Sequence, residues 1–366
     1  MSTDALLASP WDQLAQFRLR AAEHADGLID LSVGTPIDPV PDVVKDALAS
    51  AADTPGYPTT AGSARLRRAI ADWLRRHVDG ALPNVEVLPT VGSKELIGWL
   101  PTLLRLGPSD IVAIPELSYP TYEVGARMVG AQVRRCGTTE ILAGALDDAP
   151  PALLWLNSPS NPSGEVCSDE QLVGVVEWAR AHDCLIASDE CYFGLGWQQS
   201  PSSVLDPGVR RGSFEGVLAV HSLSKRSNMA GYRAGFVAGD SAVLGRVTAL
   251  RKQLGMMVPA PVQRAMAAAL DDESHAAVQR GRYERRRDVL KKALQDAGFE
   301  IHHSQAGMYL WVTRGEDCWR SVGWFARRGI LVAPGEFYGP AGSEHVRVGL
   351  TAPDDRVETA AARIVE

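Results

Sequence analysis

Short apolar runs alternate with amphipathic segments between about residues 85 and 240. Apolar residues recur at helical spacing, three and four positions apart, from Lys94 to Leu104 and from Asp169 to His182. This alternation predicts βαβ units, and therefore an α/β domain with a mostly parallel central sheet flanked by helices. The predicted strands are VEVLPT, DIVAIP, AQVRRC, PALLWLN, CLIASD, GVLAVHS and RAGFVAG.

The pattern changes near residue 271, where a long polar helix is followed by the predicted strands FEIHH, GMYLWVT, GILVAP and HVRVGLT. The opening stretch, a predicted helix from Trp11 to His24 and then LIDLSVGTP, is expected to pack with them. Single cores seldom grow beyond about 250–300 residues, so a chain of 366 residues predicts two domains. We predict a large domain at 40–270 and a smaller α+β domain formed by 1–39 and 271–366.

Composition and charge exclude several classes of partner. The formal charge of −7 opposes nucleic acid, because duplex binding needs clustered cations. The basic run at Arg282, Arg285, Arg286 and Arg287 is expected to be a solvated helix face. No segment reaches the ~20 apolar residues of a membrane span, and no leader pattern opens the chain, so no membrane partner is expected. Five scattered cysteines without a CxxC pair predict free thiols and a cytoplasmic location.

Polar clusters follow several predicted strands, at the point where each strand ends. LLWLN runs into SPSNPSG, CLIAS into DECY, and VLAVH into SLSK. In open α/β sheets, ligands bind beyond the carboxyl ends of the strands. We therefore expect one crevice to collect Asn161, Asp189, Tyr192, Ser222 and Lys225.

A lysine amine on a loop at a strand end suits imine formation. A nearby acid, phenol and amide suit an aromatic nitrogen heterocycle that carries a phenolic oxygen. The segment TVGSKEL begins a helix directly after a strand, so the amides near Gly92, Ser93 and Lys94 would face an anion such as phosphate. Arg233 would add a bidentate contact. Nucleotide, serine-hydrolase and metal sites are not indicated, because GxxxxGK[ST], GxSxG and HExxH are absent.

Across nearly the whole chain, these residues resemble the class I/II aminotransferases, pyridoxal-phosphate enzymes of fold type I. The resemblance rests on the order of SLSKRSNMAGYRAG, NSPSNPSG, SDECY, GYPTTAGSARLRRAI, PELSYPTY and HVRVGL. It implies that Lys225 holds pyridoxal 5'-phosphate as a Schiff base and that Asp189 pairs with the pyridine nitrogen. It also implies that Asn161 and Tyr192 bind the ring hydroxyl, and that Tyr119 stacks on the ring.

The same resemblance assigns the phosphate and the substrate. Ser222, Arg233 and the helix start at Gly92, Ser93 and Lys94 match the phosphate site, and Tyr57 matches a tyrosine that reaches the phosphate of the neighbouring subunit. A homodimer with shared active sites is therefore implied. Arg347 matches the arginine that binds the substrate α-carboxylate, and Gly34 matches a glycine whose small size lets backbone approach the substrate.

Structural roles compete with these assignments. Asp189 would also serve as a helix N-cap, Asn161 as a turn residue, and Tyr57 or Tyr119 as packing pieces. The Lys94 side chain is expected to be solvated, with only its amide in the phosphate site. His221 and Cys191 are expected to pack in the core.

Within the family, WDQL, DLSVGTPIDPVP, VPELSYPTY, GMMVPAPVQ and LVAPGEFYGP resemble the succinyldiaminopimelate aminotransferases of bacterial lysine and cell-wall biosynthesis. That resemblance implies amino transfer between N-succinyl-LL-2,6-diaminopimelate and 2-oxoglutarate. Both substrates carry a distal carboxylate, for which Arg251 and Lys252 are candidate partners. A solvated helix face is the favoured alternative for these two residues. Another amino-acid specificity, such as aspartate or aromatic, and a β-lyase or decarboxylase on the same fold remain alternatives. A non-enzymatic cofactor-sensing domain is disfavoured by the acidic charge and by the absence of a helix-turn-helix module.

Overall fold

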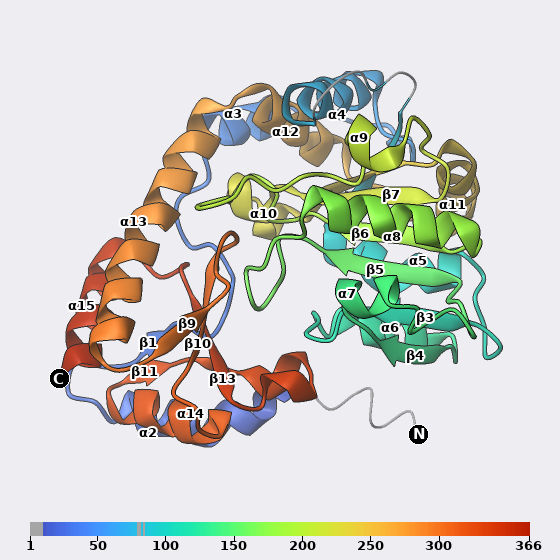
Figure 1. Ribbon diagram of the computed structural model, residues 1–366. Coiled ribbons are helices and arrows are strands. Elements are labelled where there is room, and N and C mark those ends of the chain that lie inside the picture. The colour runs from blue at the N-terminus through green and yellow to red at the C-terminus, as the bar shows by residue number, and fades with distance from the viewer. Residues whose placement is uncertain (1–9, 79–81, 83–84) are drawn as a thin grey trace.

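The computed structural model describes residues 10–78, 82 and 85–366. Residues 1–9, the first part of the predicted smaller domain, lie outside the described residues. A seven-stranded sheet forms its centre, in the order β2-β8-β7-β6-β5-β3-β4 (Figure 1). β8 runs antiparallel to β2 and β7, whereas the other neighbours pair in parallel. The predicted, mostly parallel sheet is thus confirmed. Its strands are β2 (Glu86–Val91), β3 (Ile111–Ile114), β4 (Gln132–Arg135), β5 (Leu153–Asn157), β6 (Leu185–Asp189), β7 (Val217–Ser222) and β8 (Ala234–Gly239).

Helices cover both faces of this sheet (Figure 1). Local sequence sets their starts: the Ser168 hydroxyl accepts from the Gln171 amide while the Gln171 side chain accepts from Ser168, a capping box that opens α8. Aliphatic strand residues pack between the helix layers in two apolar clusters. The helices are α3 (Asp42–Ser50), α4 (Ala64–His77), α5 (Ser93–Leu103), α6 (Thr121–Met128), α7 (Thr138–Leu142), α8 (Asp169–Ala181), α9 (Pro207–Arg210), α10 (Leu223–Arg226), η2 (Ala230–Tyr232), α11 (Ser241–Gln253) and α12 (Ala260–Asp271).

A second, antiparallel sheet of four strands, in the order β12-β13-β10-β9, lies with the C-terminal helices. The N-terminal segment packs with this part of the chain, because β1 pairs in parallel with β11 in a separate two-stranded sheet and α2 packs beside α14 (Figure 1). The predicted boundaries at residues 39/40 and 270/271 remain a proposal. The elements are η1 (Pro10–Leu14), α2 (Ala15–Ala22), β1 (Ile29–Asp30), α13 (Ser274–Asp296), β9 (Glu300–His302), β10 (Tyr309–Thr313), α14 (Cys318–Arg327), β11 (Ile330–Leu331), β12 (Ala333–Pro334), η3 (Gly335–Tyr338), η4 (Pro340–Gly342), β13 (His345–Gly349) and α15 (Asp354–Val365).

The basic run on α13 is not the solvated face that its sequence predicted. Arg286 is 3% exposed, and its guanidinium contacts Asp38 at 2.6 Å and Asp354 at 2.5 Å. Arg287 is also buried and donates to the Ser304 carbonyl at 3.1 Å. The prediction failed for these two arginines because their partners come from distant parts of the chain. Arg286 thereby ties α13 to the N-terminal segment and to the start of α15.

None of the helices in the described part of the chain is long and apolar enough to cross a membrane. The same residues contain no cluster of three or more His, Cys, Asp or Glu side chains that could hold a metal ion.

Glu190 and His221 form a buried pair of acid and imidazole at the ends of β6 and β7. Glu190 Oε2 and His221 Nε2 are 3.4 Å apart, and the His221 ring packs against Trp73 and Phe236 as the core residue it was expected to be. Burial raises the pKa of Glu190 to about 8 and lowers the pKa of His221 to about 3. Between these values the pair is therefore neutral, with the proton on Glu190.

A Glu190→Gln variant should lose a pH dependence that the native chain has. The Glu190 carboxyl ionises near its ordinary value of 4.5 once unfolded but near 8 when folded, so native stability falls as pH rises between those values. Urea unfolding of both proteins at about pH 5 and about pH 9 measures this. We expect glutamine to gain stability relative to the native chain at the higher pH. An identical difference at both pH values would contradict the neutral pair.

Candidate active site

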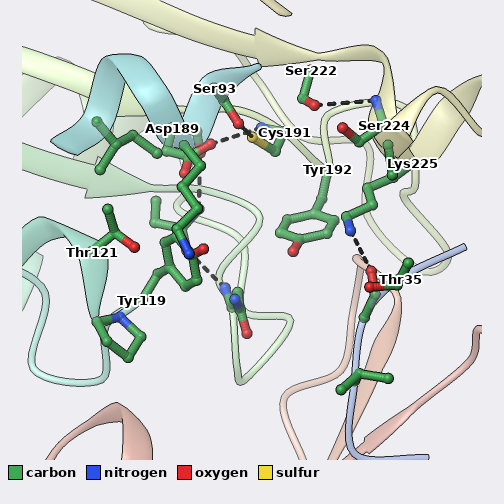
Figure 2. A pocket seen from close by; sticks show the side chains of 18 of the residues that line it. Thr35, Ser93, Tyr119, Thr121, Asp189, Cys191, Tyr192, Ser222, Ser224 and Lys225 are labelled. Carbon is green, nitrogen blue, oxygen red and sulfur yellow. Dashed lines mark hydrogen bonds between the residues drawn. The ribbon is translucent and has the colours of Figure 1, made fainter. Parts of the chain in front are cut away.

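A crevice of about 750 Å³ opens beyond the carboxyl ends of the central strands, as the strand-end rule predicted (Figure 2). It brings together most of the residues predicted from sequence, although they come from both sheets. Gly92 and Tyr57 are the exceptions: Gly92 lies just behind the lining, and Tyr57 is 98% exposed elsewhere. The predicted residues that line the crevice are Gly34, Ser93, Lys94, Tyr119, Asn161, Asp189, Tyr192, Ser222, Lys225, Arg233 and Arg347.

Lys225 lies on the short helix α10, which starts where β7 ends. Its amine donates to the carbonyl of Gly34, on the segment that follows β1. Figure 2 shows the side chain extending toward this segment past the Tyr192 ring. Burial lowers the pKa of Lys225, which favours the neutral amine that carbonyl addition requires.

Asp189 ends β6 and is 5% exposed. It accepts a hydrogen bond from the Tyr122 hydroxyl at 2.7 Å and another from the Cys191 amide at 3.1 Å. Burial raises the pKa of Asp189, since none of these donors carries a full charge. A cationic ring nitrogen placed beside it would supply that charge and keep the carboxylate ionised.

Arg347, on β13, crosses from the smaller sheet to the loop that follows β5. Its guanidinium is 3% exposed and donates to Asn161 Oδ1 at 2.8 Å and to the Ser32 carbonyl at 2.7 Å. The rings of Tyr309 and Tyr338 face it, at 3.9 and 4.9 Å from Cζ. Its Nε has no partner within the described residues. Among the described residues, the group is thus a buried cation held by neutral oxygens and aromatic faces.

The start of α5 faces the crevice, as predicted for an anion site. Gly92 precedes this helix with φ +74°, and a Cβ there would collide with the Arg233 guanidinium. Glycine therefore allows Arg233 to lie against the helix terminus, beside Ser93. The Ser222 hydroxyl, which accepts from the Ser224 amide at 3.1 Å, lines the same end of the crevice. Helix amides, hydroxyls and a guanidinium suit a phosphate group.

Some expectations were wrong. Cys191 lines the crevice rather than only packing in the core, and its thiol donates to the Ser93 hydroxyl at 3.2 Å. Arg251 is fully buried in an ion pair with Glu95 at 2.7 Å and does not line the crevice. Lys94 is exposed, as expected for its side chain, but it also lines the crevice, with its ammonium 5.8 Å from the centre of the Tyr119 ring.

Sequence reasoning missed other residues that line the crevice. Tyr122 follows Tyr119 within the quoted motif PELSYPTY, so its helical spacing was a usable signal. Tyr309 lies in the predicted strand GMYLWVT. Because this strand is buried throughout, its sequence pattern does not indicate which of its side chains face the crevice. Trp11 and Tyr338 reach the crevice from segments that the strand-end rule does not cover.

Fold and crevice together define an α/β enzyme with a buried lysine beside an anion site. The family model for aminotransferases of class I and II matches residues 26–364. The chain belongs to this family, and its fold is that of the pyridoxal-phosphate enzymes of fold type I.

Known proteins are similar to this chain along almost its full length. The probable aminotransferase Rv1178 of Mycobacterium tuberculosis is 56% identical, over 97% of this chain and 84% of the relative. The 4-dedimethylamino-4-oxo-anhydrotetracycline transaminase OxyQ of Streptomyces rimosus is 52% identical, over 97% of this chain and 98% of the relative. Among solved structures, N-succinyldiaminopimelate aminotransferase from Mycobacterium tuberculosis superposes with a TM-score of 0.86 at 27% identity, covering 99% of this chain and 98% of that one.

Pyridoxal phosphate is the cofactor of this family, and the crevice residues fit it. The phosphate suits the α5 start with Arg233, the pyridine nitrogen suits the buried carboxylate of Asp189, and the aldehyde suits the amine of Lys225. When bound, this cofactor acts as an electron sink for the substrate Cα.

Tyr122→Phe should weaken cofactor binding by about ten-fold, because the variant removes a hydrogen bond that holds the Asp189 carboxylate. Titration of the cofactor-free protein with pyridoxal phosphate, followed by absorbance, measures the dissociation constant. Tyr232→Phe is the matched control, since its ring packs on the core outside the crevice. Equal affinities for the Tyr122 variant and the native chain would refute this role.

Proposed function

We propose that this aminotransferase exchanges an amino group between N-succinyl-LL-2,6-diaminopimelate and 2-oxoglutarate in diaminopimelate and lysine biosynthesis, with ping-pong kinetics. The observation that carries the amino-transfer part is the buried crevice in which Lys225, Asp189 and Arg347 meet. The substrate part is supported by resemblance to the succinyldiaminopimelate aminotransferases, including the solved structure that superposes over 99% of the chain.

The crevice residues divide the chemistry among them. Arg347 binds the substrate α-carboxylate and so holds the Cα–H bond at a fixed angle. The Lys225 amine, once released from the cofactor, would take the proton from the substrate Cα and deliver it to the former aldehyde carbon of the cofactor, C4′. Asn161 and Tyr192 hold the ring oxygen, while Ser93, Ser222 and Arg233 hold the phosphate. One lysine thus serves both as anchor and as general acid/base.

Lys94 is the cation available for the distal carboxylate of both substrates. Its ammonium faces the crevice over Tyr119 and forms no ion pair within the described residues. The other cations that line the crevice, Lys225, Arg233 and Arg347, already have roles in this proposal. Lys94 can bind the phosphate through its amide and the substrate through its side chain.

A second candidate is transfer to a large polycyclic oxo compound, the kind of substrate that the name of OxyQ describes. The aromatic side chains of Trp11, Tyr119 and Tyr338 line the crevice, and such a wall suits a flat apolar body.

The assembly is part of the same proposal. Tyr57 does not line this crevice and has 98% of its surface exposed, which leaves it free to reach the phosphate of a second subunit in a homodimer. All five cysteines are free, which supports the proposed cytoplasmic location.

A panel of amino donors with 2-oxoglutarate tests the proposed substrate. N-succinyl-LL-2,6-diaminopimelate should give the highest kcat/KM, above glutamate, aspartate and aromatic amino acids. A flat or aromatic-leaning profile would remove this substrate, and faster transfer to a polycyclic ketone would favour the second candidate. Donor alone should release a single equivalent of oxo acid, whereas continuous release would indicate a lyase.

The same panel, run on Lys94→Gln, isolates the distal carboxylate. The KM for the succinylated donor should rise about ten-fold, since a hydrogen bond to a charged group is lost, while the KM for alanine changes little. Lys252→Gln is the control, because it removes the same charge from an exposed position outside the crevice. Equal increases for both donors would rule out this contact.

A further inference from the structure

Tyr309 is a buried phenol of the crevice that the proposed chemistry leaves without a role. It begins β10, pairs in register with Gly349 of β13, and lines the crevice. The Arg347 guanidinium covers its ring, 3.9 Å from the ring centre. This contact fixes the ring and directs its hydroxyl toward the residues around Lys225.

The Tyr309 hydroxyl meets two groups that also belong to the site. It lies 3.3 Å from the Tyr192 hydroxyl, within hydrogen-bond distance. It also fills the space beside Gly34, where a Cβ would overlap it. Because the Lys225 amine donates to the carbonyl of this same glycine, amine and phenol converge on one residue. The absence of a Cβ at Gly34 thus leaves space for the Tyr309 hydroxyl. The family resemblance implies that it also leaves space for the substrate.

Burial and several neighbouring groups act on the pKa of the Lys225 amine. Burial lowers the pKa of the amine, and the positive charges of Arg347 and Arg233 lower it further. Tyr309 and Cys191 act in the opposite direction. In turn, burial alone would raise the pKa of Tyr309, but the charges of Arg347 and Lys225 outweigh it and lower that pKa. From α13, the Tyr283 hydroxyl donates to the backbone carbonyl of Lys225 at 3.4 Å.

We propose that Tyr309 is a positioning residue for Lys225. The Tyr309 hydroxyl fixes Tyr192 and the Gly34 backbone, and it helps to retain the proton on the Lys225 amine. A phenol near an ammonium group stabilises the charged form, because its oxygen carries partial negative charge. Removing the hydroxyl therefore makes the amine lose its proton at lower pH. The inference rests on the proposed role of Lys225 but not on the identity of the substrate.

The test measures the Lys225 amine directly in the cofactor-free protein. An amine-acylating reagent modifies only the neutral form, so the labelling rate of the Lys225 peptide, followed by mass spectrometry across pH, reports the midpoint of proton loss. Tyr309→Phe keeps the ring over Arg347 and removes only the hydroxyl. We expect its midpoint to fall by about one pH unit, a ten-fold change in proton binding, because the attraction of the phenol oxygen for the ammonium group is lost.

Tyr338→Phe is the matched control. Its ring faces the same guanidinium at 4.9 Å, and its buried hydroxyl has no hydrogen-bond partner among the described residues. The midpoint should therefore match that of the native chain. An unchanged midpoint in Tyr309→Phe, or an equal shift in Tyr338→Phe, would overturn the proposal.

Gly34→Ala gives an independent check, because its Cβ would displace the Tyr309 hydroxyl. The variant should reproduce the lower midpoint, and adding Tyr309→Phe should cause no further shift, as expected for two changes that act on one contact. Additive shifts would show that the glycine and the phenol act separately and would count against the proposal. Thermal unfolding of each variant establishes that the labelled protein is folded.

Discussion

The guanidinium of Arg347 joins the two sheets at the crevice, and the arrangement of the site depends on it. It comes from β13 of the smaller sheet, yet it bonds Asn161 after β5 of the central sheet and the Ser32 carbonyl of the N-terminal segment. A buried cation without a carboxylate partner costs free energy. The neutral oxygens and the faces of Tyr309 and Tyr338 offset only part of this cost. A carboxylate bound beside Arg347 would supply the missing charge, which is the role proposed for this residue.

The same contact explains why the residues of the crevice act as one unit. Arg347 covers the ring of Tyr309, which in turn touches Tyr192 and Gly34, the glycine that accepts from Lys225. Groups for the substrate, the ring oxygen and the amine thus share a continuous set of contacts. Each of these residues is only a few contacts away from Lys225, so a substitution at any of them would alter the surroundings of the Lys225 amine.

The sequence predicted the central sheet and most of the site because both depend on local signals. Asp189 and Ser222 close their strands, and Ser93 opens a helix, so the strand-end rule places all three at one edge. Other features depend on partners far along the chain. Arg251 was a candidate for the crevice or for a solvated helix face, but its charge is matched by Glu95 and it is buried. Arg286 was expected in solvent, but it is buried against Asp38 and Asp354. Residue type and spacing carry no information about such partners.

We propose that Lys225 is the residue that binds pyridoxal phosphate in this crevice. Reduction of the cofactor-loaded protein with borohydride, followed by digestion and mass spectrometry, converts the imine to a stable amine and locates it in the sequence. We expect the cofactor to be found on the peptide that contains Lys225. Attachment to Lys94 or to any other lysine, or the absence of a labelled peptide, would contradict it.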